Sequence, residues 1–247
     1  MTRELPPRED PVDPAFFSGL AEDGRPDDAT LEALLTDCEA QLDAERGARA
    51  WLRQRPTASR LGLGLGLPAG LVLVALLFAP RPDIGDVPAW RILGVVVCTA
   101  ALLAASVWFG LRPLHRPPVP AWLEPAVVGA ALLGAVGLAA MPLLEPIPPA
   151  GAGDWGHALG CLYGGVLIAL PVFVILRLLD RGGRVFASVL SAAAAGLGAN
   201  GVLALHCAND ALGHTLRGHV GVMVALVGAT LLWTWVRGRI PGLGRPG

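Results

Sequence analysis

Six long apolar runs, separated by short polar stretches, make up most of this chain. Each run is close to the ~20 residues that a helix needs to cross the ~30 Å hydrocarbon core of a bilayer. Only the fourth run contains an Arg, Asp or Glu, and that residue stands close to its end. The runs cover residues 61–80, 92–111, 126–144, 159–179, 185–205 and 218–236. They predict six transmembrane helices.

The apolar runs lack polar positions, and this excludes a soluble helix bundle and a transmembrane β-barrel. A soluble helix bundle needs polar faces toward water, and six uncharged runs leave none. A transmembrane β-barrel needs alternating apolar and polar residues, and a stretch such as Leu71–Phe78 does not alternate. Residues 1–60 lack the apolar core of a signal peptide. The predicted fold class is all-α, a polytopic membrane protein with a six-helix transmembrane domain over residues 61–236.

Small residues indicate where these helices would touch. Without a hydrophobic drive between helices in lipid, close approach at small side chains lets dispersion hold a bundle together. Gly160 and Gly164 in the fourth run, and Ala192 and Gly196 in the fifth, predict two such contact faces.

The distribution of arginine predicts the orientation, since the chain has no lysine. Positive residues are enriched in the cytoplasmic loops of membrane proteins. If the N-terminus is cytoplasmic, the outer loops hold only Arg81, Arg91 and Arg217, and most other arginines lie on the cytoplasmic side. We therefore expect a protein of the bacterial inner membrane with both termini, including the tail 237–247, in the cytoplasm.

The segment before the first run is highly charged. Residues 1–45 hold 13 of the 20 acidic side chains, and residues 46–60 hold five arginines. Residues 1–28 contain too little apolar surface to offset chain entropy, so we expect a disordered acidic tail. Within residues 29–60, apolar side chains recur with helical spacing and predict a cytoplasmic amphipathic helix followed by a basic hinge. These side chains include Leu31, Leu34, Leu35, Leu42 and Leu52.

Two roles for the amphipathic helix are open. A helix that lies on a bilayer surface usually has a basic polar face, whereas Asp37, Glu39 and Asp43 would be repelled by anionic lipid. An apolar stripe can instead enter a groove of a partner protein, and an acidic polar face suits a basic partner. We therefore favour docking to a cytoplasmic protein through the five leucines.

Histidine and cysteine gather near the predicted outer ends of the last three runs. His157 and Cys161 are four residues apart and share one face of a helix. Ionisable groups at membrane depth are costly and usually face the interior of a bundle. The segment after the fifth run adds His206, Cys207, His214 and His219.

Three explanations of this cluster remain open. The first is structural, with polar caps and interhelical hydrogen bonds. The second is a metal site, because imidazole and thiolate suit zinc or copper, and the six candidate donors exceed the usual four. The third is a thiol pair: Cys161 and Cys207 would lie on the oxidising side, where a disulfide persists. Cys38 would stay reduced in the cytoplasm.

The sequence gives little support for a nucleic-acid-binding protein or an enzyme. A formal net charge of −1 implies no general affinity for nucleic acid. No phosphate-binding glycine loop and no Ser-His-Asp arrangement stands out. We therefore expect a protein without catalytic activity. The alternative is a membrane metal-binding protein, or an enzyme in which a metal held by the His/Cys cluster activates water.

Three stretches of the chain carry a resemblance to a known family. They are ERGARAWLRQRPT at 45–57, GCLYGG at 160–165 and ALHCANDALGHTLRGH at 204–219. Together with the six spans and the acidic N-terminal segment, residues 1–45, which we call the acidic head, these stretches resemble the NrsF-type (CarR-like) membrane anti-sigma factors. Members of that family inhibit extracytoplasmic-function sigma factors. The first stretch is similar to the approach to the first span in myxobacterial members. The resemblance extends over residues 31–236.

The resemblance implies a function and a site. It implies that the cytoplasmic head sequesters an extracytoplasmic-function sigma factor at the membrane, and that an envelope signal sensed by the bundle releases it. Two cysteines are implicated in sensing in this family, and their counterparts here are Cys161 and Cys207.

Overall fold

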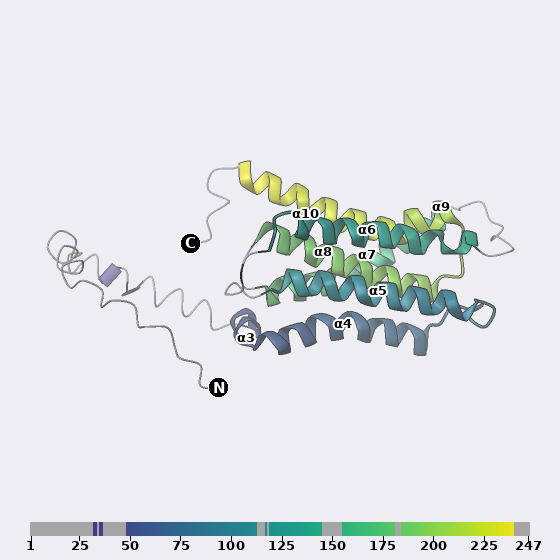
Figure 1. The fold of residues 1–247 in the computed structure, drawn as a ribbon, viewed down its shortest axis with the longest axis horizontal. Helices are drawn as coiled ribbons and strands as arrows, with labels where there is room; N and C mark the ends of the chain where they lie inside the picture. Colours follow the sequence, from purple (N-terminus) through teal and green to yellow (C-terminus); the bar gives the residue numbers. More distant parts are fainter. Residues whose placement is uncertain are drawn as a thin grey trace, which may run out of the picture. The chain divides into compact units, whose positions relative to one another are not determined.

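The computed structural model describes residues 32–33, 35–36, 48–112, 117, 119–144, 155–180 and 184–239. The chain divides into two compact units, Met1–Ala50 and Trp51–Gly247, and the second unit contains the bundle. Every regular element in the described part of the chain is a helix. The long helices of the bundle run side by side along one common direction (Figure 1).

Six helices among the described residues are long and apolar enough to cross a membrane, which confirms the predicted fold class. A short helix, α3 (Ala48–Gln54), comes before them. Two of the six contain a change of helix type, a 3₁₀ turn and a π turn. The elements are α4 (Thr57–Phe78), α5 (Ala89–Gly110), α6 (Leu123–Ala140) with the 3₁₀ turn η1 (Met141–Leu144), α7 (Trp155–Leu179), α8 (Val185–His206), and α9 (Leu212–His214) with the π turn η2 (Thr215–Val220) and α10 (Gly221–Arg239).

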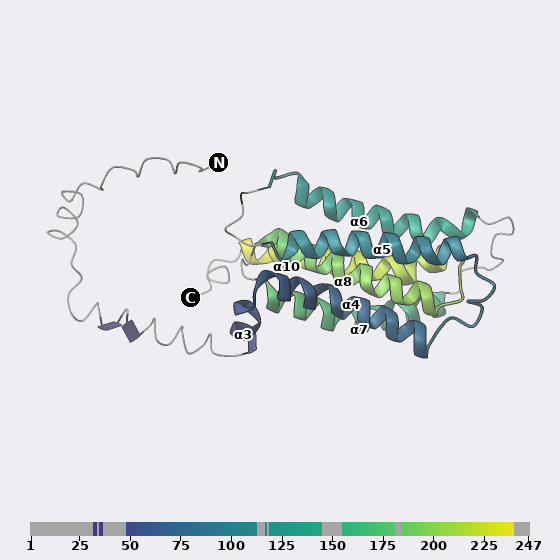
Figure 2. The same cartoon turned by 60° about the horizontal axis from the view of Figure 1, so that its bottom comes forward.

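Helix α8 is the centre of the bundle. In its apolar stretch 94% of the residues are buried, against 11–33% in the other five membrane helices. It packs against α4, α5, α6, α7 and α10. Figure 2 shows it lying between the other helices, as does Figure 1. A helix can be surrounded in this way when its side chains are small, and Ala192–Ala195 are completely buried.

Glycines mark the closest approaches between helices. A Cβ atom on Gly196 of α8 would lie 2.7 Å from the Cα of Met223 in α10. A Cβ on Gly165 of α7 would lie 2.8 Å from Leu203. The contact face predicted at Gly196 is therefore confirmed. The one predicted at Gly160 and Gly164 is wrong, because a Cβ there would meet nothing within 4 Å.

The predicted N-terminal amphipathic helix is not supported by the described residues. Within residues 31–53 they comprise two helical fragments, at 32–33 and 35–36, and part of the separate helix α3. Leu31, Leu34 and Leu42 lie outside the described residues. Leu35 is exposed, whereas Leu52 of α3 is half-buried against the core of the bundle.

Arg60, which the sequence places in the basic hinge, is buried in the bundle near the start of α4. Its side chain is 1% exposed and donates to the backbone oxygens of Leu179, at 2.8 Å, and Leu111, at 3.5 Å. These oxygens lie at the C-terminal ends of α7 and α5, where the helix dipole favours a cation. We call this end of the bundle the Arg60 end.

Candidate functional site

The opposite end of the bundle brings together four of the six predicted histidine and cysteine donors. His157 and Cys161 lie in the first turns of α7, Cys207 directly follows α8, and His214 ends α9. One possible ligand atom from each residue lies within 4.8 Å of those from the other three. We call these four residues the His/Cys group, and this end of the bundle the His/Cys end.

Cys207 is the centre of the group. Its Sγ lies 3.8 Å from the Sγ of Cys161, 3.8 Å from Nε2 of His157 and 3.3 Å from Nε2 of His214. The rings of His157 and His214 meet edge to face with centroids 4.9 Å apart. Cys207 and His214 are buried, Cys161 is half-buried and His157 is exposed. The group therefore extends from the protein surface into the bundle.

Local geometry explains why these residues meet. His157 and Cys161 are one helical turn apart and face the same way, as their spacing predicts. Helix α8 ends at His206, and the extended backbone of Cys207 turns its side chain toward α7. The close approach of the π turn to α7 also contributes: a Cβ on Gly218 would lie 3.1 Å from the Cβ of Cys161.

The two remaining predicted donors lie elsewhere. His206 is exposed, and its Nδ1 is 2.8 Å from the backbone oxygen of Ala79, the residue that follows α4. His219 is buried and packs its ring edge-on against His214, with centroids 5.3 Å apart. His206 thus bridges α8 to the end of α4, and His219 lies beside His214 of the His/Cys group.

A network of ion pairs lies next to the group. Asp210, three residues after Cys207, pairs with Arg81 at 2.9 Å and with Arg91. Arg81 also pairs with Asp83 at 2.7 Å. Burial alone would raise the pKa of Asp210, but hydrogen bonds from the two arginines lower it below the ordinary 3.8. The hydrogen bond from Arg81 likewise lowers the pKa of Asp83, so both carboxylates are ionised at neutral pH.

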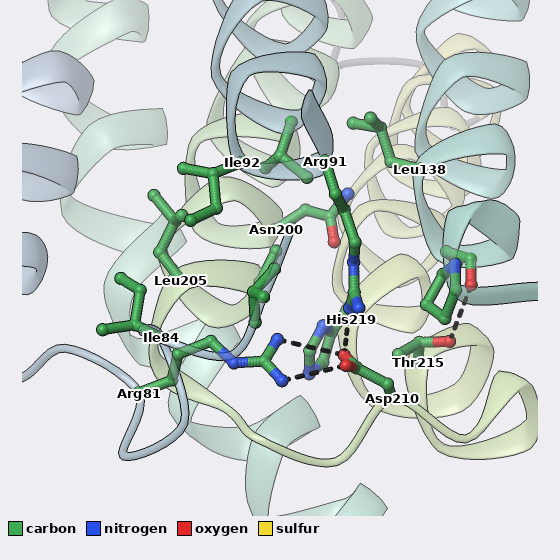
Figure 3. A pocket seen from close by; sticks show the side chains of 15 residues that line it. Arg81, Ile84, Arg91, Ile92, Leu138, Asn200, Leu205, Asp210, Thr215 and His219 are labelled. Carbon is green, nitrogen blue, oxygen red and sulfur yellow. Dashed lines mark hydrogen bonds and ion pairs between the residues drawn. The ribbon is translucent and has the colours of Figure 1, made fainter. Parts of the chain in front are cut away.

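Figure 3 shows the small cavity that this network lines. The side chains of Arg81 and Arg91 converge on Asp210, and Asn200, Thr215 and His219 form another part of the wall. The cavity volume is about 30 Å³, whereas sites for organic ligands occupy roughly 300–1,000 Å³. The cavity is therefore too small to serve as an active site for an organic substrate.

The ion-pair network was not among the predicted site residues. The sequence does contain an indication of it, because Arg81, Arg91 and Asp210 all lie between predicted apolar runs, close to their ends. Charges at the edge of a membrane domain tend to pair with one another. From the sequence, Arg81 and Arg91 contribute only to the predicted orientation.

The arrangement at this end suits thiol chemistry or metal binding. Two thiols and two imidazoles converge, a donor set that soft and borderline metals prefer. The two sulfur atoms are also close enough to join after a small movement, because a disulfide needs about 2.05 Å between them. Among the described residues, this is the group that could hold a metal ion.

Comparison with known proteins identifies the family. The model of the family described as "NrsF: Negative regulator of sigma F" matches residues 45–237, most of the chain and all six membrane helices. No curated protein and no solved structure matches the chain. The matched region contains the whole His/Cys group, and the role named by the family is regulatory rather than enzymatic. The chain therefore belongs to the NrsF family of negative regulators of sigma F.

Proposed function

We propose that this protein is an anti-sigma factor of the bacterial inner membrane that binds an extracytoplasmic-function sigma factor through its N-terminal segment. Both termini lie in the cytoplasm, and the protein has no catalytic role. The observation that carries the proposal is the family match over residues 45–237. The six membrane helices and the clustering of arginine on one side of them support it.

The docking surface is the apolar stripe of the acidic head. Leu35 is exposed, and Leu31, Leu34 and Leu42 lie on either side of it at helical spacing in the sequence. Leu52 contributes less than the sequence suggests, because it packs against the bundle core. The acidic side chains of residues 1–45 would attract a basic surface of the sigma factor and speed its capture.

Changing Leu35→Asp together with Leu42→Asp should abolish docking. Burying one leucine contributes roughly 1.5–3 kcal/mol, so losing two should weaken binding by about a hundredfold or more. The measurement is co-purification of the full-length protein, in nanodiscs, with each sigma factor of the same organism.

The matched control for docking is Ala33→Asp with Ala40→Asp. It adds the same charges at the same seven-residue spacing but leaves the leucines in place, and it should retain the sigma factor. If the leucine variant retains the sigma factor as well as wild type does, the docking surface is wrong. If wild type retains none of the sigma factors, the anti-sigma role itself is wrong.

The signal acts at Cys161 and Cys207. Their sulfur atoms lie 3.8 Å apart, so oxidation to a disulfide or binding of a metal would need little rearrangement. A signal changes an equilibrium only through its different affinity for the two states. The oxidised or metal-bound pair must therefore favour the state of the protein that releases the sigma factor.

A second candidate role, zinc binding, is favoured by the distances within the group. In a tetrahedron with Zn–S bonds of about 2.3 Å and Zn–N bonds of about 2.0–2.1 Å, two sulfurs lie about 3.8 Å apart and a sulfur and a nitrogen about 3.5 Å. The separations from Cys207 Sγ are 3.8, 3.8 and 3.3 Å. His157, Cys161, Cys207 and His214 would hold the ion, which would cross-link α7, α8 and α9.

Metal analysis tests the zinc hypothesis. We expect one zinc per chain in protein purified in nanodiscs, and loss of the metal in His214→Ala. His206→Ala is the control, because that ring bonds to Ala79 instead of joining the group, and it should keep its zinc. Metal-free wild type, or equal metal in both variants, would exclude the site.

A further inference from the structure

The segment that begins at Cys207 is fastened to the end of α4. His206 Nδ1 lies 2.8 Å from the backbone oxygen of Ala79, the C-terminal cap of α4. The backbone N–H of Arg81 donates to the backbone oxygen of Leu205 at 3.0 Å. The guanidinium of Arg81 donates to the backbone oxygen of Ala208 at 3.4 Å. These contacts lie on both sides of Cys207 along the chain, so Cys207 cannot move far without straining them.

Asp210 makes the strongest of these links. It accepts hydrogen bonds from Arg81 at 3.1 and 2.9 Å and also pairs with Arg91 at the start of α5. The side chain of Arg81 is 3% exposed and that of Asp210 14%. Charged pairs so far removed from water are held more tightly than surface pairs. At the His/Cys end, α4 is thus tied to the Cys207 segment through charges that are buried on Arg81 and largely buried on Asp210.

The Arg60 end of α4 is held in a different way. Arg60 donates to backbone oxygens at the ends of α7 and α5. These bonds place one cation over two helix C-termini, and α7 is also the helix that carries Cys161. Both ends of α4 are therefore held by polar contacts to neighbouring elements.

Most of α4 faces away from the bundle core. Only 11% of the residues in its apolar stretch are buried, the smallest share of the six membrane helices. A cavity of about 420 Å³ lies beside it, lined by Leu65, Pro68 and Val72 of α4 together with Thr99, Leu103 and Gly201. Pro68 removes one hydrogen bond of the helix ladder, which makes bending easier. Helix α4 therefore has space to tilt or bend while its ends stay attached.

We propose that α4 is the element that transmits the chemical state of Cys207 to the N-terminal segment. The inference rests on the proposed function, because it connects the sensing cysteines with the segment that binds the sigma factor. A displacement of Cys207 pulls on Arg81 and Ala79 through Asp210 and His206. The cavity allows α4 to follow, and α4 continues through Pro56 into α3 and the head.

The test measures hydrogen exchange of residues 51–60 in the full-length protein in nanodiscs. Diamide oxidises Cys161 and Cys207 to a disulfide, takes up their two hydrogen atoms and becomes the hydrazine. Mass spectrometry of the linked peptides confirms the bond. In wild type we expect oxidation to change the exchange rate of residues 51–60 by roughly fivefold or more, the lower range of allosteric coupling.

Two carboxylates that share the same arginine provide a matched pair of variants. Asp210→Asn removes the ion pairs that tie the Cys207 segment to Arg81 and should weaken the response of residues 51–60. Asp83→Asn also removes an ion pair from Arg81, but Asp83 belongs to the same loop as Arg81, so the response should persist. Asp210→Glu should restore the response.

A cavity-filling variant keeps the test independent of any loss of folding. Ala104→Leu adds apolar volume to the large cavity, should leave the melting temperature equal or higher, and should reduce the response by restricting α4. Equal responses in Asp210→Asn and Asp83→Asn, or an unchanged response in Ala104→Leu, would overturn the inference. So would an oxidised wild type whose exchange does not change. None of these results bears on sigma-factor co-purification, so failure of the proposed function would be seen separately.

Discussion

Gly196→Leu should prevent the bundle from assembling. A Cβ at this position would lie 2.7 Å from the Cα of Met223 and 2.8 Å from its Cβ, so α8 and α10 must separate to admit a larger side chain. Overpacking a core costs about 1–3 kcal/mol or more, a large part of a total stability of roughly 5–15 kcal/mol. The atom that blocks the larger side chain is the backbone Cα of Met223, which cannot rotate away as a side chain can.

The measurement is the yield and melting temperature of monodisperse protein purified in detergent. We expect Gly196→Leu to give almost no folded protein and Gly196→Ala to give a lowered melting temperature. Gly160→Leu is the control, since a Cβ at Gly160 has no neighbour within 4 Å, and it should melt close to wild type. Equal melting of the two leucine variants would mean that α8 and α10 are not in close contact.

Cys161→Ser and Cys207→Ser should each abolish the response to oxidants and to soft metals. A disulfide needs both sulfurs, and the tetrahedral metal site loses one of its two thiolates in either variant. Serine is nearly the same size as cysteine, so the variants should fold. In wild type we expect the oxidant or metal to change sigma-dependent transcription by roughly 5–150-fold, which corresponds to a coupling free energy of about 1–3 kcal/mol. In either serine variant we expect no change.

Cys98→Ser is the matched control for the two thiol variants. Cys98 is exposed on α5 and does not belong to the His/Cys group. The Cys98→Ser variant should therefore respond to oxidants and soft metals as wild type does. The measurement is a sigma-dependent reporter before and after addition of the oxidant or metal, with protein levels monitored. A full response in Cys207→Ser would remove this residue from the sensing mechanism.

The membrane helices could be predicted because length and lack of charge are properties of each run by itself. Their arrangement could not, since every run is apolar on all sides and gives no amphipathic face to orient it. The position of α8 at the centre has a cue in its composition: Ala192–Ala195 and Gly196 form the smallest-volume stretch within the six apolar runs. The same reasoning failed at Gly160, where glycine faces open space.

The candidate site could be predicted only where it depends on local spacing. His157 and Cys161 meet because they are one turn apart on α7. The contacts of Cys207 with His157 and Cys161 depend on how α8 packs against α7, which no spacing specifies. For the same reason the sequence grouped His206 with the other donors, although its ring bonds to the end of α4 instead. The burial of Arg60 could not be predicted either. Its partners are backbone oxygens of helices distant in the sequence, so the sequence alone places it in the basic hinge.

The π turn η2 (Thr215–Val220) determines which residues of the last membrane helix share a side. In an α-helix two residues five positions apart point about 140° away from each other. His214 and His219 nevertheless have ring centroids 5.3 Å apart, because the wider turn accommodates one additional residue. Deleting a single residue between them would restore regular winding and leave the two histidines four positions apart, on the same side of an α-helix. A relative one residue shorter at this point would therefore keep the two rings together, and Met223 against Gly196, without a π turn.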